Sequence, residues 1–141
     1  MSDKDRFVDN GDGTVTDHQT GLMWSKTDTM NDFKKWVNYQ ESADYARTLR
    51  ENKMAGYDDW RLPDKDEMST LYVESCSIKD TFGKEIHISD CFAGGGGFTM
   101  VAEIIRGRPR TWVFNLRNRE YSQPDGLWTL SEAARAVRTI K

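Results

Sequence analysis

The feature of this sequence that most restricts its fold is a change in hydrophobic period along the chain. Between residues 31 and 52, apolar and aromatic side chains recur three or four positions apart, which is the period of a helix. Between residues 98 and 116 they alternate with period two, which is the period of a strand. Helices in the first half and an antiparallel meander in the second predict an α+β fold.

The strands expected at both ends of the chain are set by turn residues. Asn10-Gly11 and Asp12-Gly13 supply the positive φ angles of a tight turn, which predicts a hairpin between Phe7-Val8 and residues 14–16. A second turn over residues 17–21 leads into a short apolar run suited to a buried strand. Further strands are expected over residues 22–24, 98–105, 112–116, 120–123 and 133–140, with a turn at 106–109.

Two helices are expected in the first half. Asn31 or Asp32 can cap a helix that ends near Asn52. Pro63 keeps Leu62 extended, and Asp64 then caps a second helix that ends near Ser75. The four glycines at 94–97 predict a flexible loop. The buried face of the first helix is expected to hold Trp36, Tyr39, Ala43, Ala46 and Leu49 or Arg50. That of the second helix is expected to hold Met68, Leu71 and Tyr72.

Length and charge restrict the class of protein. A chain of 141 residues fits a single domain spanning residues 1–141. Its net charge of -3 argues against a specific nucleic-acid binder, which is usually basic. No apolar run is long enough to span a membrane, and residues 1–6 lack the apolar stretch of a secretory signal. We therefore expect a cytoplasmic protein without a membrane span, with export as the alternative if a signal was removed.

Several blocks of this sequence resemble the Lcl C-terminal family, named for the C-terminal domain of a Legionella collagen-like adhesin and of unknown function. The resemblance begins with residues 6–17 and Thr20-Gly21-Leu22-Met23-Trp24, and includes the helix with Trp36 and Leu49. It continues through Asp59-Trp60-Arg61-Leu62-Pro63 with Glu67, and ends with Arg135-Ala136-Val137-Arg138.

The resemblance implies a C-type-lectin-like fold. In such a fold the N- and C-terminal strands pair in one antiparallel sheet, two helices pack on it, and a loop-rich second half presents the ligand surface. It also implies binding without known catalysis, in some members to sulfated glycans and as a trimer. The sequence departs from the family where a Trp-Ser motif is replaced by the glycine run and Phe98-Thr99-Met100. No export signal and no collagen-like module are visible either.

The candidate ligand-binding residues lie in the last third of the chain. Between residues 104 and 119 there are five arginines and no Asp or Glu, although the chain as a whole is acidic. Guanidinium forks suit carboxylate, sulfate or phosphate groups, but such a surface can also be solvated and paired with nearby acids. The two aromatic candidates could contact a ligand or belong to the core. The candidates are Arg106, Arg108, Arg110, Arg117, Arg119, Tyr121 and Trp128.

Two other motifs are better explained by turns than by ligands. If Gly13 takes the glycine position of a calcium loop within residues 9–17, Val8 and Gln19 fall on ligand positions that they cannot fill. Residues 106–110 match the core of an AT-hook, but they join two alternating strands, where Gly107 and Pro109 have a turn role. We expect no metal site and no cofactor, although calcium at residues 9–17 is left open.

No residue carries a recognisable catalytic pattern. His18 and His87 have no Ser or Cys in an activating arrangement, and Cys76 and Cys91 match no motif of the formylglycine-generating enzymes known to us. Free thiols are favoured, although the sequence leaves open whether the two cysteines form a disulfide. Trp24, Trp36, Trp60 and Trp112 are expected in the core, and Arg61 in an ion pair with Asp58, Asp59 or Glu67.

The sequence therefore predicts a non-catalytic binding module. Its surface, residues 94–128, would recognise an anionic glycan or a protein partner. The first alternative is a protein-interaction or self-assembly module, for which a homo-oligomer is expected. The second is a thiol or formylglycine-generating-like enzyme.

Overall fold

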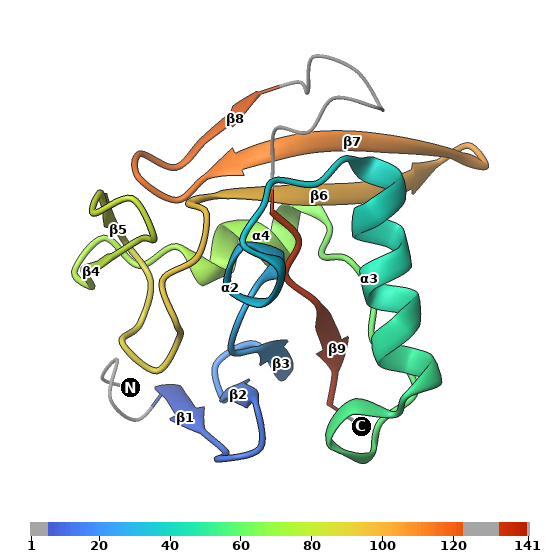
Figure 1. Cartoon of the computed structure of the whole chain (residues 1–141), viewed down its shortest axis with the longest axis horizontal. Coiled ribbons are helices and arrows are strands. Elements are labelled where there is room, and N and C mark those ends of the chain that lie inside the picture. The colour runs from blue at the N-terminus through green and yellow to red at the C-terminus, as the bar shows by residue number, and fades with distance from the viewer. Residues whose placement is uncertain (1–5, 123–132, 141) are drawn as a thin grey trace.

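The C-terminal strand joins the three N-terminal strands in one antiparallel sheet, in which the first and last strands form opposite edges (Figure 1). This computed structural model describes residues 6–122 and 133–140. Trp24 lies opposite Val15 on one side and Val137 on the other, so the two chain ends pair as the resemblance implied. The last strand is shorter than predicted, and Ala133 makes only an isolated bridge to Thr99. The sheet has the order β1 (Phe7–Asp9), β2 (Thr14–Asp17), β3 (Leu22–Ser25), β9 (Val137–Thr139).

A second, three-stranded sheet contains the long hairpin predicted from the alternating pattern. Its turn is shorter than predicted, because Arg106 and Gly107 alone make it, with φ of 52° and 77°. Arg108 already pairs with Ile105 in the ladder, so Arg108 and Pro109 belong to the strand. The strands are β6 (Phe98–Ile105), β7 (Arg108–Asn115) and β8 (Glu120–Ser122); a separate short hairpin is made by β4 (Ile78–Lys79) and β5 (Glu85–Ile86).

The prediction of one helix over residues 31–52 is wrong at its first turns. The chain forms two helices, α2 (Thr29–Phe33) and α3 (Tyr39–Glu51), because each has its own N-cap. The Asp28 side chain accepts from the backbone N–H of Asn31, and the Asn38 side chain accepts from that of Glu41. Lys34 ends α2 in the left-handed region, with φ of 61°. A 3-10 turn, η1 (Met54–Gly56), follows α3.

Helix α4 (Lys65–Leu71) begins as predicted and ends one turn early. Asp64 and Glu67 form a capping box, in which each side chain accepts from the other's backbone N–H. Met68 and Leu71 are buried, as expected. The predicted end near Ser75 is wrong because Tyr72 is already extended, with ψ of 124°.

The core lies in two clusters on either side of the first sheet's last strands. The larger contains Phe7, Trp24, Met68 and Phe114, and the smaller gathers beneath α3 around Trp60. Trp24 and Trp60 are fully buried, so their core assignment is confirmed. Trp112 packs against the larger cluster, whereas Trp36 is only half-buried. No helix in the described part of the chain is long and apolar enough to cross a membrane.

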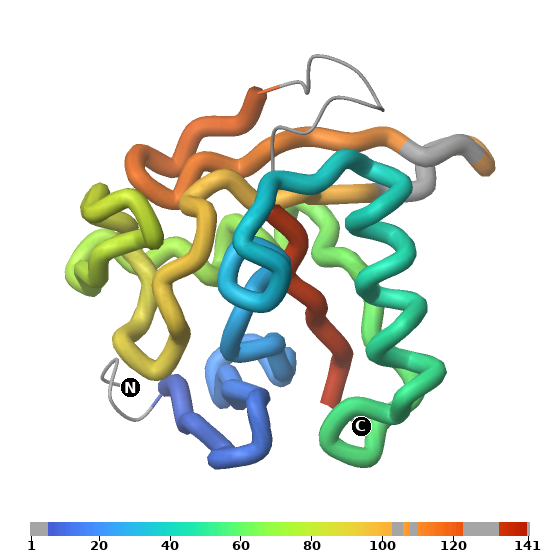
Figure 2. The backbone as a smooth tube through the Cα atoms, in the orientation of Figure 1, coloured from blue at the N-terminus to red at the C-terminus, as the bar shows by residue number. Residues whose placement is uncertain are grey.

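The glycine run is an irregular segment, as predicted, but it is packed against other elements rather than open (Figure 2 shows it in yellow before β6). Gly95, Gly96 and Gly97 are buried. A Cβ at Gly95 would overlap the Asp28 carboxylate, and one at Gly96 would lie 2.6 Å from a ring carbon of Trp36. Glycine is needed here because only a bare backbone fits in this space.

Candidate functional site

The structure separates the predicted arginines into two groups at opposite ends of the β6–β7–β8 sheet (Figure 1). Arg106 and Arg110 lie at the hairpin turn, whereas Arg117 and Arg119 follow the far end of β7. Extended strand rises about 3.3 Å per residue, so the groups stand on the order of 20 Å apart. They therefore do not form one compact cluster. Trp128 and the Arg108 side chain lie outside the described residues.

Arg117 is matched to an internal acid. Its Nη2 and Nε lie 2.9 and 3.3 Å from Oδ2 of Asp80, a carboxylate with no solvent exposure. Its guanidinium also stands 5.0 Å above the ring of Phe98. These contacts tie the β7–β8 turn to the β4–β5 hairpin. The solvated-surface alternative, with pairing to nearby acids, is therefore correct for this arginine.

Tyr121 belongs to the packing of β8 against α4. Its hydroxyl donates to the carbonyl of Lys65 at 2.6 Å and lies 2.6 Å from the Ser69 hydroxyl. The ring makes an edge contact with Phe114, with centroids 4.8 Å apart. Arg119 is exposed and stands 5.9 Å above the ring of Tyr72. Of the two, only Arg119 is presented to solvent.

The arginines of the hairpin turn are also exposed. Arg106 and Arg110 are both at the surface. In the ladder, Arg110 lies directly opposite Glu103. Like Arg119, they are accessible to an anionic group. They do not lie near Arg119, however, because they are at the other end of the sheet.

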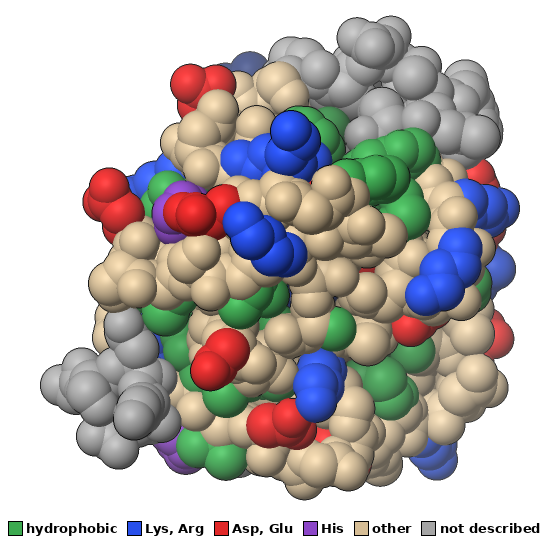
Figure 3. Space-filling model, turned by 60° about the vertical axis from the view of Figure 1, so that its left-hand side comes forward, with side chains coloured by type: hydrophobic (Ala, Val, Ile, Leu, Met, Phe, Trp, Pro, Cys, Tyr) green, Lys and Arg blue, Asp and Glu red, His purple; other side chains and the backbone are tan. Residues whose placement is uncertain are grey.

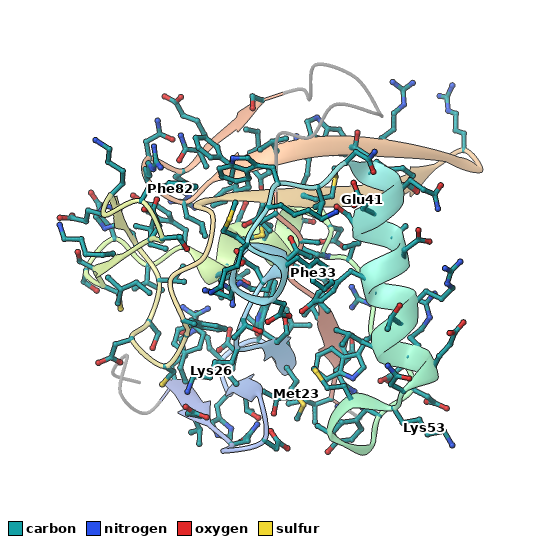
Figure 4. All side chains as sticks on the ribbon, in the orientation of Figure 1. Met23, Lys26, Phe33, Glu41, Lys53 and Phe82 are labelled. Carbon is teal, nitrogen blue, oxygen red and sulfur yellow. The ribbon has the colours of Figure 1, made fainter. Side chains whose placement is uncertain are left out.

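An aromatic surface that sequence reasoning missed lies beside the glycine run, and we call it the Trp36 surface: Trp36, Phe82, Phe98 and Arg117. The Trp36 and Phe82 rings are stacked, with centroids 5.5 Å apart and planes at 17°. Phe98 meets the other side of Trp36 edge-on at 6.0 Å. Phe82 is 51% exposed and lies at the β4–β5 hairpin (Figure 4). An exposed aromatic pair of this kind is typical of an interaction surface.

Exposed basic residues share the β4–β5 hairpin with Phe82. Lys79 and Lys84 are exposed in the same short hairpin as Phe82, and Arg117 stands over Phe98. Figure 3 views the molecule with this side brought forward, and basic and hydrophobic side chains lie next to one another on the upper half of that face. The surface therefore combines an apolar platform with two exposed lysines, Lys79 and Lys84, in the same hairpin, next to the exposed Glu85.

Trp36 was missed because the helical spacing placed it on a buried stripe. It lies in the connector between α2 and α3, where it is free to turn outward. The pattern that separates two helices here is a pair of caps, Asp28 with Asn31 and Asn38 with Glu41. Reading both caps would have placed residues 34–37 in a loop. Phe82 has no such signal in the sequence.

The predicted stripe of α3 is divided: Tyr39 and Ala43 line an open groove, whereas Ala46 is buried and Leu49 packs against the smaller core cluster. The groove has a volume of about 700 Å³ and is closed on the other side by Leu62 and Ala102. Besides Ala46, the helix buries Ser42 and Tyr45, which lie outside the predicted stripe. The two arginines in the groove are engaged: Arg50 donates to the Trp60 carbonyl at 2.9 Å, and Arg61 pairs with Glu67.

Arg61 forms the ion pair expected from the sequence, and its partner is Glu67. Nη1 and Nη2 of Arg61 lie 2.6 and 2.7 Å from the two carboxylate oxygens. Burial alone would raise the pKa of Glu67, but hydrogen bonds from Arg61 and from the Asp64 backbone outweigh it and lower that pKa. The pair pins the segment before α4.

The acidic residues of the first hairpin close its turns. Oδ1 of Asp9 accepts from the Gly11 N–H at 2.9 Å, and Oδ1 of Asp12 accepts from the Thr14 N–H at 3.1 Å. Lys26 pairs with Asp9 at 2.7 Å, and this hydrogen bond lowers the pKa of Asp9. These contacts support the turn interpretation of residues 9–17.

Both cysteines are free thiols and half-buried. Cys91 directs its Sγ at the Phe7 carbonyl, at 3.6 Å. The Cys76 carbonyl is 2.9 Å from Nδ1 of His87, which also lies 3.5 Å from a Glu85 oxygen through Nε2. The histidine is thus held by backbone and by a carboxylate.

Antiparallel sheets and separate helices define an α+β domain. The chain belongs to the Lcl C-terminal domain family, whose model matches residues 13–138. No curated protein and no solved structure shows a significant match to the chain. The resemblance noted in the sequence is therefore confirmed.

Proposed function

We propose that this chain is a non-catalytic binding module with a C-type-lectin-like fold, and that it recognises an anionic glycan through the Trp36 surface. The observation that carries the proposal is the exposed stack of Phe82 on Trp36, with two exposed lysines in the hairpin that carries Phe82. Paired chain ends and helices packed beside a sheet support the fold assignment.

The chemistry of the surface suits a charged sugar. The apolar C–H face of a sugar ring packs well on a flat aromatic ring, and Phe82 leaves half of its surface open for such a contact. Lys79 and Lys84 stand ready for a carboxylate or sulfate group on the same sugar. A purely electrostatic site would not need the aromatic pair, and a purely apolar one would not need the lysines.

The glycine run supports the same surface from behind. Gly96 lets Trp36 approach the backbone closely, and Gly97 lies next to Asp80 and Arg117. The Asp80–Arg117 ion pair then holds the β4–β5 hairpin in place beside Phe98. Pre-arranged side chains bind with less loss of conformational entropy.

The proposal is tested by measuring the binding of a heparin fragment and of neutral dextran to purified protein at two salt concentrations. Phe82→Ala is expected to weaken heparin binding at least fivefold, because the stacking face is lost. Lys79→Ala/Lys84→Ala is expected to weaken it similarly and to reduce its dependence on salt. The matched control is Val8→Ala, an exposed apolar residue on β1 that is expected to change nothing.

A further variant, Arg106→Ala/Arg110→Ala, separates this surface from the hairpin turn. If heparin binding is lost only in that variant, the arginine turn is the site and the Trp36 surface is not. If neutral dextran binds as well as heparin, charge recognition is wrong. Circular dichroism of each variant confirms that the fold is retained.

A further inference from the structure

A second hollow, which we call the α2–α3 groove, lies between α2 and α3 and is not lined by Trp36. It has a volume of about 620 Å³ and runs between the end of α2 and one face of α3. Figure 4 labels Phe33 and Glu41, which come from these two helices. Its lining residues are Asp32, Phe33, Lys35, Glu41, Asp44, Tyr45, Thr48 and Leu49.

The apolar part of the groove is aromatic and accessible. Phe33 is 51% exposed, although it is a large hydrophobic residue. Its ring meets the ring of Tyr45 nearly at a right angle, with centroids 5.9 Å apart. Leu49 continues this wall along α3. An exposed aromatic ring in a hollow is a preferred place for an apolar or cationic group.

The rim of the groove is acidic. Asp32, Glu41 and Asp44 contribute three carboxylates against the single lysine, Lys35. Lys35 pairs with Glu41 at 2.9 Å, and Arg47 pairs with Asp44 at 3.0 Å, both on the exposed surface. Exposed ion pairs of this kind contribute little to stability, so another cation can readily take the place of the lysine or arginine.

Asp32 has a different environment from the other two acids. Its carboxylate accepts from the hydroxyls of Tyr45 and Thr27, at 3.0 and 2.9 Å, and it pairs with no cation in the described part of the chain. Burial and the charge of Asp32 raise the pKa of Tyr45, so its hydroxyl stays protonated and donates to the carboxylate. The negative charge of Asp32 is thus fixed in position next to the aromatic wall.

We propose that the α2–α3 groove binds a basic segment of a protein partner, with an arginine or lysine side chain placed between Phe33 and the Asp32 carboxylate. An aromatic face and a carboxylate together attract a guanidinium or ammonium group whose stem is apolar. A sulfated or phosphorylated ligand is repelled by the same rim. This site is therefore separate from the proposed glycan surface and goes beyond it.

The dimensions of the groove suit a short peptide. From Glu41 to Leu49 the helix rises by about 12 Å at 1.5 Å per residue. Three or four extended residues span that length at roughly 3.3 Å each. One cationic side chain at Asp32 and an apolar neighbour on Leu49 would fill the hollow.

The test uses two peptides labelled with fluorescein at the N-terminal amine, fluoresceinyl-Leu-Arg-Leu-Arg-amide and fluoresceinyl-Leu-Gln-Leu-Gln-amide, with fluorescence anisotropy as the readout. We expect the arginine peptide to bind at least tenfold more tightly, with affinity that falls as salt rises. Phe33→Ala and Asp32→Asn are each expected to weaken it at least fivefold. Asp66→Asn removes an exposed acid from α4 instead and serves as the matched control.

Three results would overturn the proposal. Equal binding of the two peptides would show that charge is not recognised. Unchanged binding in Phe33→Ala and Asp32→Asn would place the peptide elsewhere. A molar mass that rises with protein concentration in light scattering, and that Asp32→Asn returns to the monomer value, would identify a second copy of the chain as the occupant. Heparin binding by the same variants reports separately on the glycan surface.

Discussion

The carboxylate of Asp28 accepts a hydrogen bond from the backbone N–H of Gly96 at 3.0 Å, although 68 positions separate the two residues. The same carboxylate caps α2 by accepting from the Asn31 N–H at 3.0 Å. It also lies 4.0 Å from the buried guanidinium of Arg135. This one acid therefore joins α2, the glycine run and the segment that leads into β9.

Replacing Gly95 by Ala is expected to destabilise the fold by about 3 kcal/mol or more, because the added methyl group would overlap the Asp28 carboxylate. Urea unfolding followed by tryptophan fluorescence measures this change. Gly11→Ala is the control: its Cβ meets open space, and only its φ of 78° opposes the substitution. A smaller loss for Gly95→Ala than for Gly11→Ala would contradict the packing described.

Arg135→Lys is expected to lower stability by roughly 3 kcal/mol, although the charge is kept. The guanidinium donates from Nη1 to the carbonyls of Ser25 and Lys26, at 2.9 and 2.6 Å, and from Nη2 to that of Ala93 at 3.2 Å. An ammonium group is a single point and cannot reach all three. Thermal unfolding measures the effect, with the exposed Arg119→Lys as control. Equal melting temperatures would refute this role.

Acid is expected to destabilise the fold through Asp17. Oδ1 and Oδ2 of Asp17 accept from Nε and Nη2 of Arg6, at 2.9 and 2.8 Å, in a buried pair. Burial alone would raise the pKa of Asp17, but the hydrogen bonds from Arg6 and Thr20 outweigh it and lower that pKa. The unfolded chain then binds the proton more readily than the native one.

The stabilisation from this pair is consequently complete above the unfolded pKa of about 3.9 and is lost as the pH falls through the lowered native value. Asp17→Asn is expected to cost roughly 3–5 kcal/mol at neutral pH, because it leaves Arg6 buried without its counter-charge. It should also flatten the stability profile below about pH 4. Chemical unfolding at several pH values measures both effects, and an unchanged profile in the variant would contradict the assignment.

Arg106→Asn is expected to stabilise the β6–β7 hairpin by about 0.5–1 kcal/mol. Arg106 and Gly107 both have positive φ, as in the two-residue turns for which Asn-Gly is preferred. Arginine is a costly choice at φ of 52°, which Asn adopts more readily. Urea unfolding of the variant measures the gain. A loss of stability would show that the arginine side chain makes contacts that outweigh its backbone strain.

The sequence by itself determined the strands of the two larger sheets in outline and the N-cap of α4 at Asp64, because these depend on residues close together in the chain. Asn10-Gly11 and Asp12-Gly13 dictate the first turns through positive φ, and alternation alone located β6 and β7. The family blocks added the pairing of the chain ends. The break after Phe33 was also encoded locally, in the Asp28 and Asn38 caps, but the helical spacing of Trp36 concealed it.

Only the tertiary structure decided which side chains reach the surface together. Five arginines that are close in sequence lie at the two ends of β7, because an extended strand places residues several positions apart far from one another in space. Trp36 and Phe82 meet although 46 residues separate them, since the glycine run lets the β4–β5 hairpin approach the connector. Contacts of this kind depend on close packing between distant segments, which no local pattern of residues records.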